Sequence, residues 1–186
     1  LVIVRLVVPA DPGYAVWGTT RAGEPLRWDP CAPVRLVVNP QHAPPGAVGD
    51  LRTALALLAD ASGLDLVLVD TTAERPTADR PLTRPTPEGR AWREVLVAWS
   101  TPAATDLPLT ALDRGVAVPV AVRDGDREAL VTGQVVLNAG RDDLVAGFGD
   151  RSDAWGATLV HELGHVLGLA HVDDPSQLMA ADPGTG

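Results

Sequence analysis

Residues 161 to 171 read His-Glu-Leu-Gly-His-Val-Leu-Gly-Leu-Ala-His and hold three of the four histidines in the chain. His161 and His165 are four positions apart, so in a helix both imidazoles project from the same face. Two imidazoles placed in this way can bind one Zn²⁺ ion at about 2.0–2.1 Å each. The spacing therefore predicts a helix that carries two metal ligands.

Gly168 is the expected end of this helix, because glycine adopts the left-handed backbone conformation at little cost. A sharp turn there would bring His171 back as a third ligand. Three protein ligands leave one position for water, which is typical of a catalytic zinc site. The alternative is a core helix with buried, hydrogen-bonded histidines, but five fixed positions in so short a stretch rarely arise by chance.

Glu162 follows the first histidine and is placed to reach a water on the metal without being a ligand. Zinc lowers the pKa of such a water to about 7 and polarises a carbonyl group. Glu162 can then act as general base and later deliver the proton to the departing amine. The alternative for Glu162 is a solvated carboxylate on a helix surface.

This stretch resembles the zinc signature of the metzincin metalloendopeptidases. Eight residues after His171 stands Met179, the only methionine in the chain. In metzincins a methionine turn below the metal supports the three histidines, and the resemblance implies that role for Met179 rather than ordinary core filling. The segment 174–179 is similar to that of the matrixin branch, so we expect a bacterial matrixin-like protein.

The resemblance implies a zinc-dependent endopeptidase with one catalytic Zn²⁺ ion, a protein or peptide substrate and a secreted or extracytoplasmic location. Its motif covers residues 161–179, and a looser match in element order covers 33–179. Two alternatives stay open: a non-catalytic zinc-binding module and a zinc hydrolase of a non-protein substrate. The first is favoured by the seven residues that follow Met179, where the family usually continues further.

The chain of 186 residues is most simply an irregular lead-in at 1–32 and one metzincin-like catalytic domain at 33–186. Its net charge of −9 and the absence of a basic cluster argue against nucleic acid as a partner. No apolar run reaches the roughly 18–20 residues of a membrane span. Oligomeric state is not indicated.

Hydrophobic periodicity predicts an α+β fold of α/β-like character. We expect a mostly parallel five-stranded sheet with an antiparallel edge strand, a backing helix and an active-site helix, which the resemblance makes a zincin or metzincin fold. The expected strands are 34–38, 64–69, 95–99, 116–122 and 130–137, and the expected helices are 47–61 and 154–167. Residues 71–90 are expected to form a loop, 64–69 to be buried on both faces, and Ser152 or Asp153 to cap the second helix.

Pro119 lacks a backbone donor, so its strand should lie at the edge of the sheet. An extended peptide could add to that edge as a further strand, and the resemblance assigns substrate binding to the equivalent strand. The alternative is an exposed edge that Pro119 merely protects. The candidate residues are Val116, Ala117, Val118, Pro119 and Val120.

Two further features allow metal chemistry. Asp142, Asp143, Asp150 and Asp153 could contribute to a Ca²⁺ site, although a solvated acidic loop is the simpler interpretation. Cys31 is the only cysteine, so no internal disulfide forms. We expect it to be a buried structural residue rather than a thiolate that silences the zinc.

Overall fold

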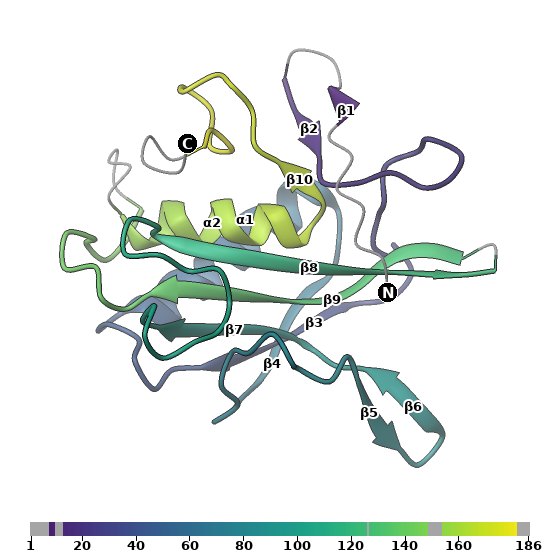
Figure 1. Ribbon diagram of the computed structural model, residues 1–186, viewed down its shortest axis with the longest axis horizontal. Coiled ribbons are helices and arrows are strands. Elements are labelled where there is room, and N and C mark those ends of the chain that lie inside the picture. Colours follow the sequence, from purple (N-terminus) through teal and green to yellow (C-terminus); the bar gives the residue numbers. More distant parts are fainter. Residues whose placement is uncertain (1–7, 10–12, 126, 149–153, 182–186) are drawn as a thin grey trace.

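A five-stranded sheet forms the centre of the computed structural model, which describes residues 8–9, 13–125, 127–148 and 154–181. The strand order is β4–β3–β7–β9–β8 (Figure 1). All neighbouring strands are parallel except β8, which runs antiparallel to β9. The strands are β3 (Val34–Asn39), β4 (Leu66–Thr71), β7 (Val95–Ser100), β8 (Gly115–Asp124) and β9 (Arg127–Asn138). The expected mixed α+β sheet is therefore confirmed.

Helices α1 (Ala47–Ser62) and α2 (Trp155–Val166) pack on one face of this sheet. Their apolar stripes, Leu51–Leu55–Leu58 and Trp155–Leu159–Leu163, meet the inward side chains of β3, β7 and β9 in one core. Gly63 ends α1 in the left-handed conformation with φ of 71°. Ala61, in the last turn of α1, is exposed.

On the opposite face, Leu107 and Leu109 pack against Val136, and residues 72–82 make polar contacts. Arg80 is buried, and its guanidinium donates to the Glu74 carboxylate and to the Glu94 carbonyl. Gln134 of β9 exchanges two hydrogen bonds with the backbone of Thr77. A buried arginine needs such partners, since an uncompensated buried charge is strongly destabilising.

Residues 71–90 are not simply a loop, and this prediction was wrong. Strands β5 (Thr83–Thr86) and β6 (Gly89–Trp92) form a hairpin that projects from the body at the lower right of Figure 1. Gly89, with φ of 130°, closes its two-residue turn. Pro85 had suggested irregular structure, but an isolated two-stranded hairpin has edges on both sides and tolerates a proline.

The two outer strands differ from each other. Strand β8 lies at the sheet edge as Pro119 predicts. Strand β4 was expected to be buried on both faces, yet it is the other outer strand and its apolar residues are only half-buried. An apolar run of six residues cannot by itself distinguish a central strand from an outer strand that one helix covers.

The lead-in joins the main body through a small second sheet. Strand β2 (Ala15–Val16) pairs with β1 (Val8–Pro9) on one side and with β10 (Leu169–Ala170) on the other, both antiparallel. The apolar run 1–8 predicts one strand, but residues 1–7 lie outside the described residues. No helix in the described ranges is long and apolar enough to cross a membrane.

Candidate metal centre

Helix α2 carries the first two histidines on the side that faces away from the sheet core. Its buried residues recur at three- and four-residue intervals, which leaves His161 and His165 half-buried at the helix surface. The N-cap residue is Ala154, which forms no side-chain cap. The expected caps, Ser152 and Asp153, lie outside the described residues.

Gly168 ends the helix region with φ of 105°, a conformation that L side chains rarely adopt. Leu167 precedes it as the C-cap, so the predicted exit is confirmed. A Cβ atom at position 168 would lie 3.1 Å from the Leu26 carbonyl oxygen, and the Trp17 amide donates to the Gly168 carbonyl at 2.7 Å. Residues of the lead-in therefore hold the turn that leads to His171.

The turn brings the three histidines together as predicted. The Nε2 atom of His165 lies 3.2 Å from that of His161 and 3.1 Å from that of His171. The Nε2 atoms of His161 and His171 are 3.1 Å apart. Ligands at 2.0–2.1 Å around a tetrahedral ion are about 3.3–3.4 Å apart. In the described part of the chain these histidines are the one group of three or more potential ligands close enough to hold a metal ion.

Hydrogen bonds at Nδ1 set the tautomer of two of these histidines. His161 Nδ1 lies 2.6 Å from the Leu178 carbonyl oxygen, and His165 Nδ1 lies 2.9 Å from that of Leu169. A carbonyl only accepts, so each Nδ1 carries the proton and each Nε2 presents a lone pair. Two lone pairs 3.2 Å apart repel each other, and a cation between them removes that repulsion. The donor set thus fits a metal ion.

Glu162 lies in the same pocket and is buried to 7% exposure. It packs against Gly115, the first residue of β8. A Cβ atom at position 115 would lie 2.9 Å from Glu162 Cγ and 3.1 Å from Oε1. The missing side chain at Gly115 therefore makes room for the carboxylate beside the histidines, a feature that the sequence did not reveal.

Met179 lies directly against α2. Its Sδ atom would be 2.8 Å from a Cβ at Gly164, so the small residue between the two helical histidines allows this approach. The Met179 carbonyl accepts from the Val172 amide at 2.9 Å, next to His171. Asp174 closes the intervening loop by accepting from Ser176, and these hydrogen bonds lower the pKa of Asp174.

These groups open into a cavity of about 330 Å³ that we call the metal pocket. Val116 and Ala117 of β8 line it, whereas Val118, Pro119 and Val120 lie further along the strand. Five lining residues were missed by sequence reasoning: Gly115, described above, and Trp17, Pro108, Asp113 and Arg114. Trp17 comes from the lead-in, and no local pattern could have linked it to a site some 150 residues away.

The structure also bears on the predictions for Cys31 and for the acidic residues of the possible Ca²⁺ site. Cys31 is exposed, so its prediction as a buried structural residue was wrong. It lies in a turn closed by Asp29, whose carboxylate accepts from the Cys31 amide, rather than in the following strand. Asp143 is bound by Arg141, which lowers the pKa of Asp143 to about 2, and Asp150 and Asp153 lie outside the described residues.

Comparison with known proteins adds no relative: no protein-family model matches the sequence, and no curated protein matches it.

Proposed function

We propose that this chain is a zinc-dependent endopeptidase with a metzincin fold of matrixin-like type. The observation that carries the proposal is the triangle of three Nε2 atoms with a buried carboxylate in the same pocket. Two imidazoles four apart on a helix and a third after a sharp turn suit zinc better than Ca²⁺ or Mg²⁺, which prefer oxygen ligands. Zinc held there would supply an activated water and an electrophile for a carbonyl oxygen.

The residues of the chain have distinct parts in this proposal. His161, His165 and His171 hold the ion, and the Leu178 and Leu169 carbonyls orient the first two rings. Glu162 accepts a proton from the attacking water and returns it to the departing amine. Gly115 leaves space for Glu162, and Met179 supports the helix from below.

The substrate would bind in an extended form along β8. This strand is the outer one of the sheet, so its far side presents backbone groups that no sheet neighbour pairs. Its first residues, Gly115 to Ala117, line the metal pocket, so a peptide added there would pass the histidines. This geometry favours a peptide over another acyl substrate.

The test combines zinc content with cleavage of a quenched peptide library. We expect about one zinc per chain in the wild type and in Glu162→Gln, with cleavage in the wild type alone. Loss of a general base of this kind lowers rates by roughly 10²- to 10⁴-fold. Glu88→Gln is the matched control, because Glu88 is an exposed glutamate on the hairpin turn. Its replacement should change neither the zinc content nor the cleavage rate.

Three outcomes would contradict the proposal. A folded wild type without zinc would remove its basis. Zinc without cleavage in any variant would indicate a binding module. Hydrolysis of small esters without any peptide cleavage would indicate a hydrolase of non-protein substrates.

A further inference from the structure

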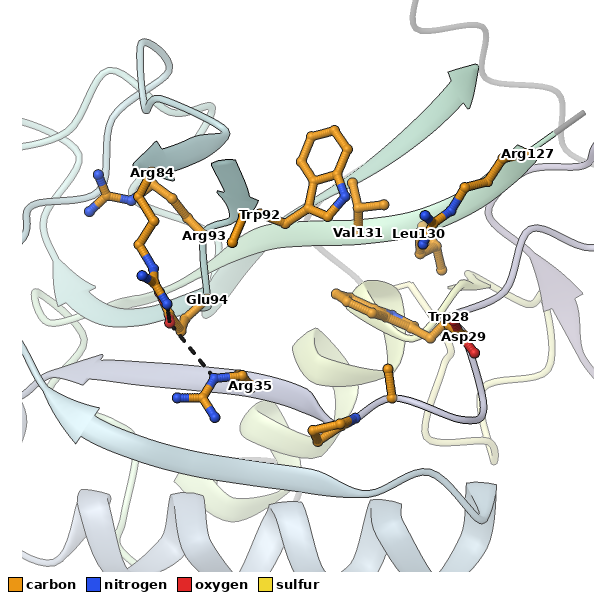
Figure 2. Close-up of a pocket in the computed structure, with 13 residues that line it drawn as sticks. Trp28, Asp29, Arg35, Arg84, Trp92, Arg93, Glu94, Arg127, Leu130 and Val131 are labelled. Atoms are coloured by element: carbon orange, nitrogen blue, oxygen red, sulfur yellow. Dashed lines mark hydrogen bonds and ion pairs between the residues drawn. The ribbon is translucent and has the colours of Figure 1, made fainter. Parts of the chain in front are cut away.

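A second pocket lies where the segment around Trp28, the hairpin β5–β6 and the first half of β9 meet (Figure 2). None of its lining residues also lines the metal pocket. Its volume is about 200 Å³, below the 300–1,000 Å³ of typical small-molecule sites. It is therefore sized for one large side chain. We call it the arginine–tryptophan pocket.

The centre of this pocket is apolar. Figure 2 shows the rings of Trp28 and Trp92 on either side of an opening backed by Leu130 and Val131. Trp92 is 37% exposed at the end of β6, and Trp28 is fixed by its ring N–H, which donates to the Val166 carbonyl at 2.9 Å. Exposed tryptophans held in place dominate the binding energy of many protein interfaces.

The rim of the pocket has a positive excess, with four arginines against Asp29 and Glu94, although one of the arginines, Arg93, is bound by Glu74 outside the pocket. Arg84 donates to Glu94 at 3.0 Å, and Arg35 lies 3.8 Å from the same oxygen, so one carboxylate serves two guanidinium groups. Arg127, at the other end in Figure 2, forms no ion pair with a carboxylate of the described residues. In a chain with a net charge of −9, this local excess of positive charge selects an anionic ligand.

We propose that the arginine–tryptophan pocket binds an acidic peptide segment that carries an aromatic or large aliphatic side chain. That side chain enters between the two indole rings, and carboxylates before and after it meet Arg127 and Arg84. A peptide supplies both parts, because the pocket holds only one side chain while arginines lie at both ends. The peptide would be part of a protease substrate only if the proposed function holds. The binding itself does not depend on the proposed function.

The test uses a labelled peptide, acetyl-Asp-Glu-Phe-Glu-Asp-amide, titrated with the Glu162→Gln protein so that no cleavage occurs. We expect fluorescence anisotropy to show binding that weakens with added salt. Trp92→Ala should weaken binding roughly tenfold or more, and Arg127→Gln about two- to fivefold. Leu57→Ala and Arg52→Gln remove an exposed apolar side chain and an exposed charge from α1, and neither should change the affinity.

Several results would overturn this inference. One is equal binding of the uncharged peptide acetyl-Asn-Gln-Phe-Gln-Asn-amide, and another is unchanged affinity in a folded Trp92→Ala variant. Binding that His165→Ala abolishes and Trp92→Ala retains would place the peptide in the metal pocket. Dimers in sedimentation that Trp92→Ala dissociates would assign the pocket to a second copy. Absence of zinc or cleavage would overturn only the proposed function, because anisotropy requires neither.

Discussion

The metal pocket and the arginine–tryptophan pocket are assembled in opposite ways. All three histidines and Glu162 come from eleven consecutive residues, and one helix and one turn bring them together. The arginine–tryptophan pocket takes its residues from three segments, 28–35, 84–94 and 127–131. The clustering of the histidines depends mainly on local backbone geometry, whereas the arginine–tryptophan pocket depends on how distant elements pack. Substitutions should therefore affect the two pockets separately.

The largest expected effect comes from His165→Ala, which removes one of the three proposed zinc ligands. Two remaining imidazoles bind zinc far more weakly, so we expect a loss of affinity well beyond the roughly 10- to 100-fold seen when only a supporting contact is removed. Zinc titration with a competing chelator measures this loss. Peptide binding at the arginine–tryptophan pocket should be unchanged in the same variant. If both properties fell together in a folded protein, the two pockets would not be independent.

Next in size is the effect of Gly115→Ala on hydrolysis. The new Cβ would lie 2.9 Å from Glu162 Cγ, so the carboxylate must move away from the metal pocket. A shift of about 1 Å can reduce a rate roughly 100-fold. Zinc content should stay at one per chain, because the three atoms nearest to the added Cβ all belong to Glu162 and none to a histidine. The control is Gly49→Ala, where an added Cβ meets no atom within 4 Å. An unaltered cleavage rate in Gly115→Ala would count against Glu162 as the base.

A smaller effect is expected from Gly168→Ala, which tests the turn before His171. Its φ of 105° strains any other residue, and the added Cβ would approach the Leu26 carbonyl. We expect a loss of about 1–3 kcal/mol in the free energy of unfolding together with weaker zinc binding. Gly63→Ala is the matched control, since Gly63 also has positive φ at a helix end but has no neighbour within 4 Å. It should cost stability without changing zinc affinity, as measured by denaturant unfolding and zinc titration.

The smallest expected effect is the loss of stability when Glu94, in the arginine–tryptophan pocket, is replaced by glutamine. Burial acts to raise the pKa of Glu94. Hydrogen bonds from its backbone N–H and from Arg84, together with the charge of Arg35, outweigh burial, so the pKa lies below its ordinary value of 4.5. A lowered folded-state pKa stabilises the protein above pH 4.5, and this contribution is lost as the pH falls through the folded-state value. Because both arginines are partly exposed, Glu94→Gln should cost at most about 1 kcal/mol at pH 7.

The same Glu94→Gln variant sharpens the comparison between the pockets. Removal of the carboxylate leaves Arg84 and Arg35 without their shared partner, so the acidic peptide should bind about two- to fivefold more tightly. A residue with a purely structural role would not improve binding when removed. Weaker peptide binding in a folded Glu94→Gln protein would contradict the proposed charge selection, and unaltered zinc content is the internal control.

The difference between the pockets also explains what the sequence could reveal. Spacing within residues 161–179 predicted the ligands, the helix and the turn, because each depends on neighbours within a few positions. The central strands and both helices followed from periodicity in the same way. Trp17 at the rim of the metal pocket, Gly115 beneath Glu162 and the whole arginine–tryptophan pocket arise from pairing between distant segments. The hairpin β5–β6 escaped prediction because Pro85 and Pro87 favour irregular structure.

The pairing of β2 with β10 has a consequence for the order of events during biosynthesis. Strand β10 is synthesised about 150 residues after its partner β2. The Gly168 carbonyl accepts its hydrogen bond from the Trp17 amide only when both segments have been synthesised. Contacts between such distant residues form slowly. The three histidines therefore reach their final arrangement late, and a metal ion that binds them would enter a nearly complete domain rather than a nascent chain.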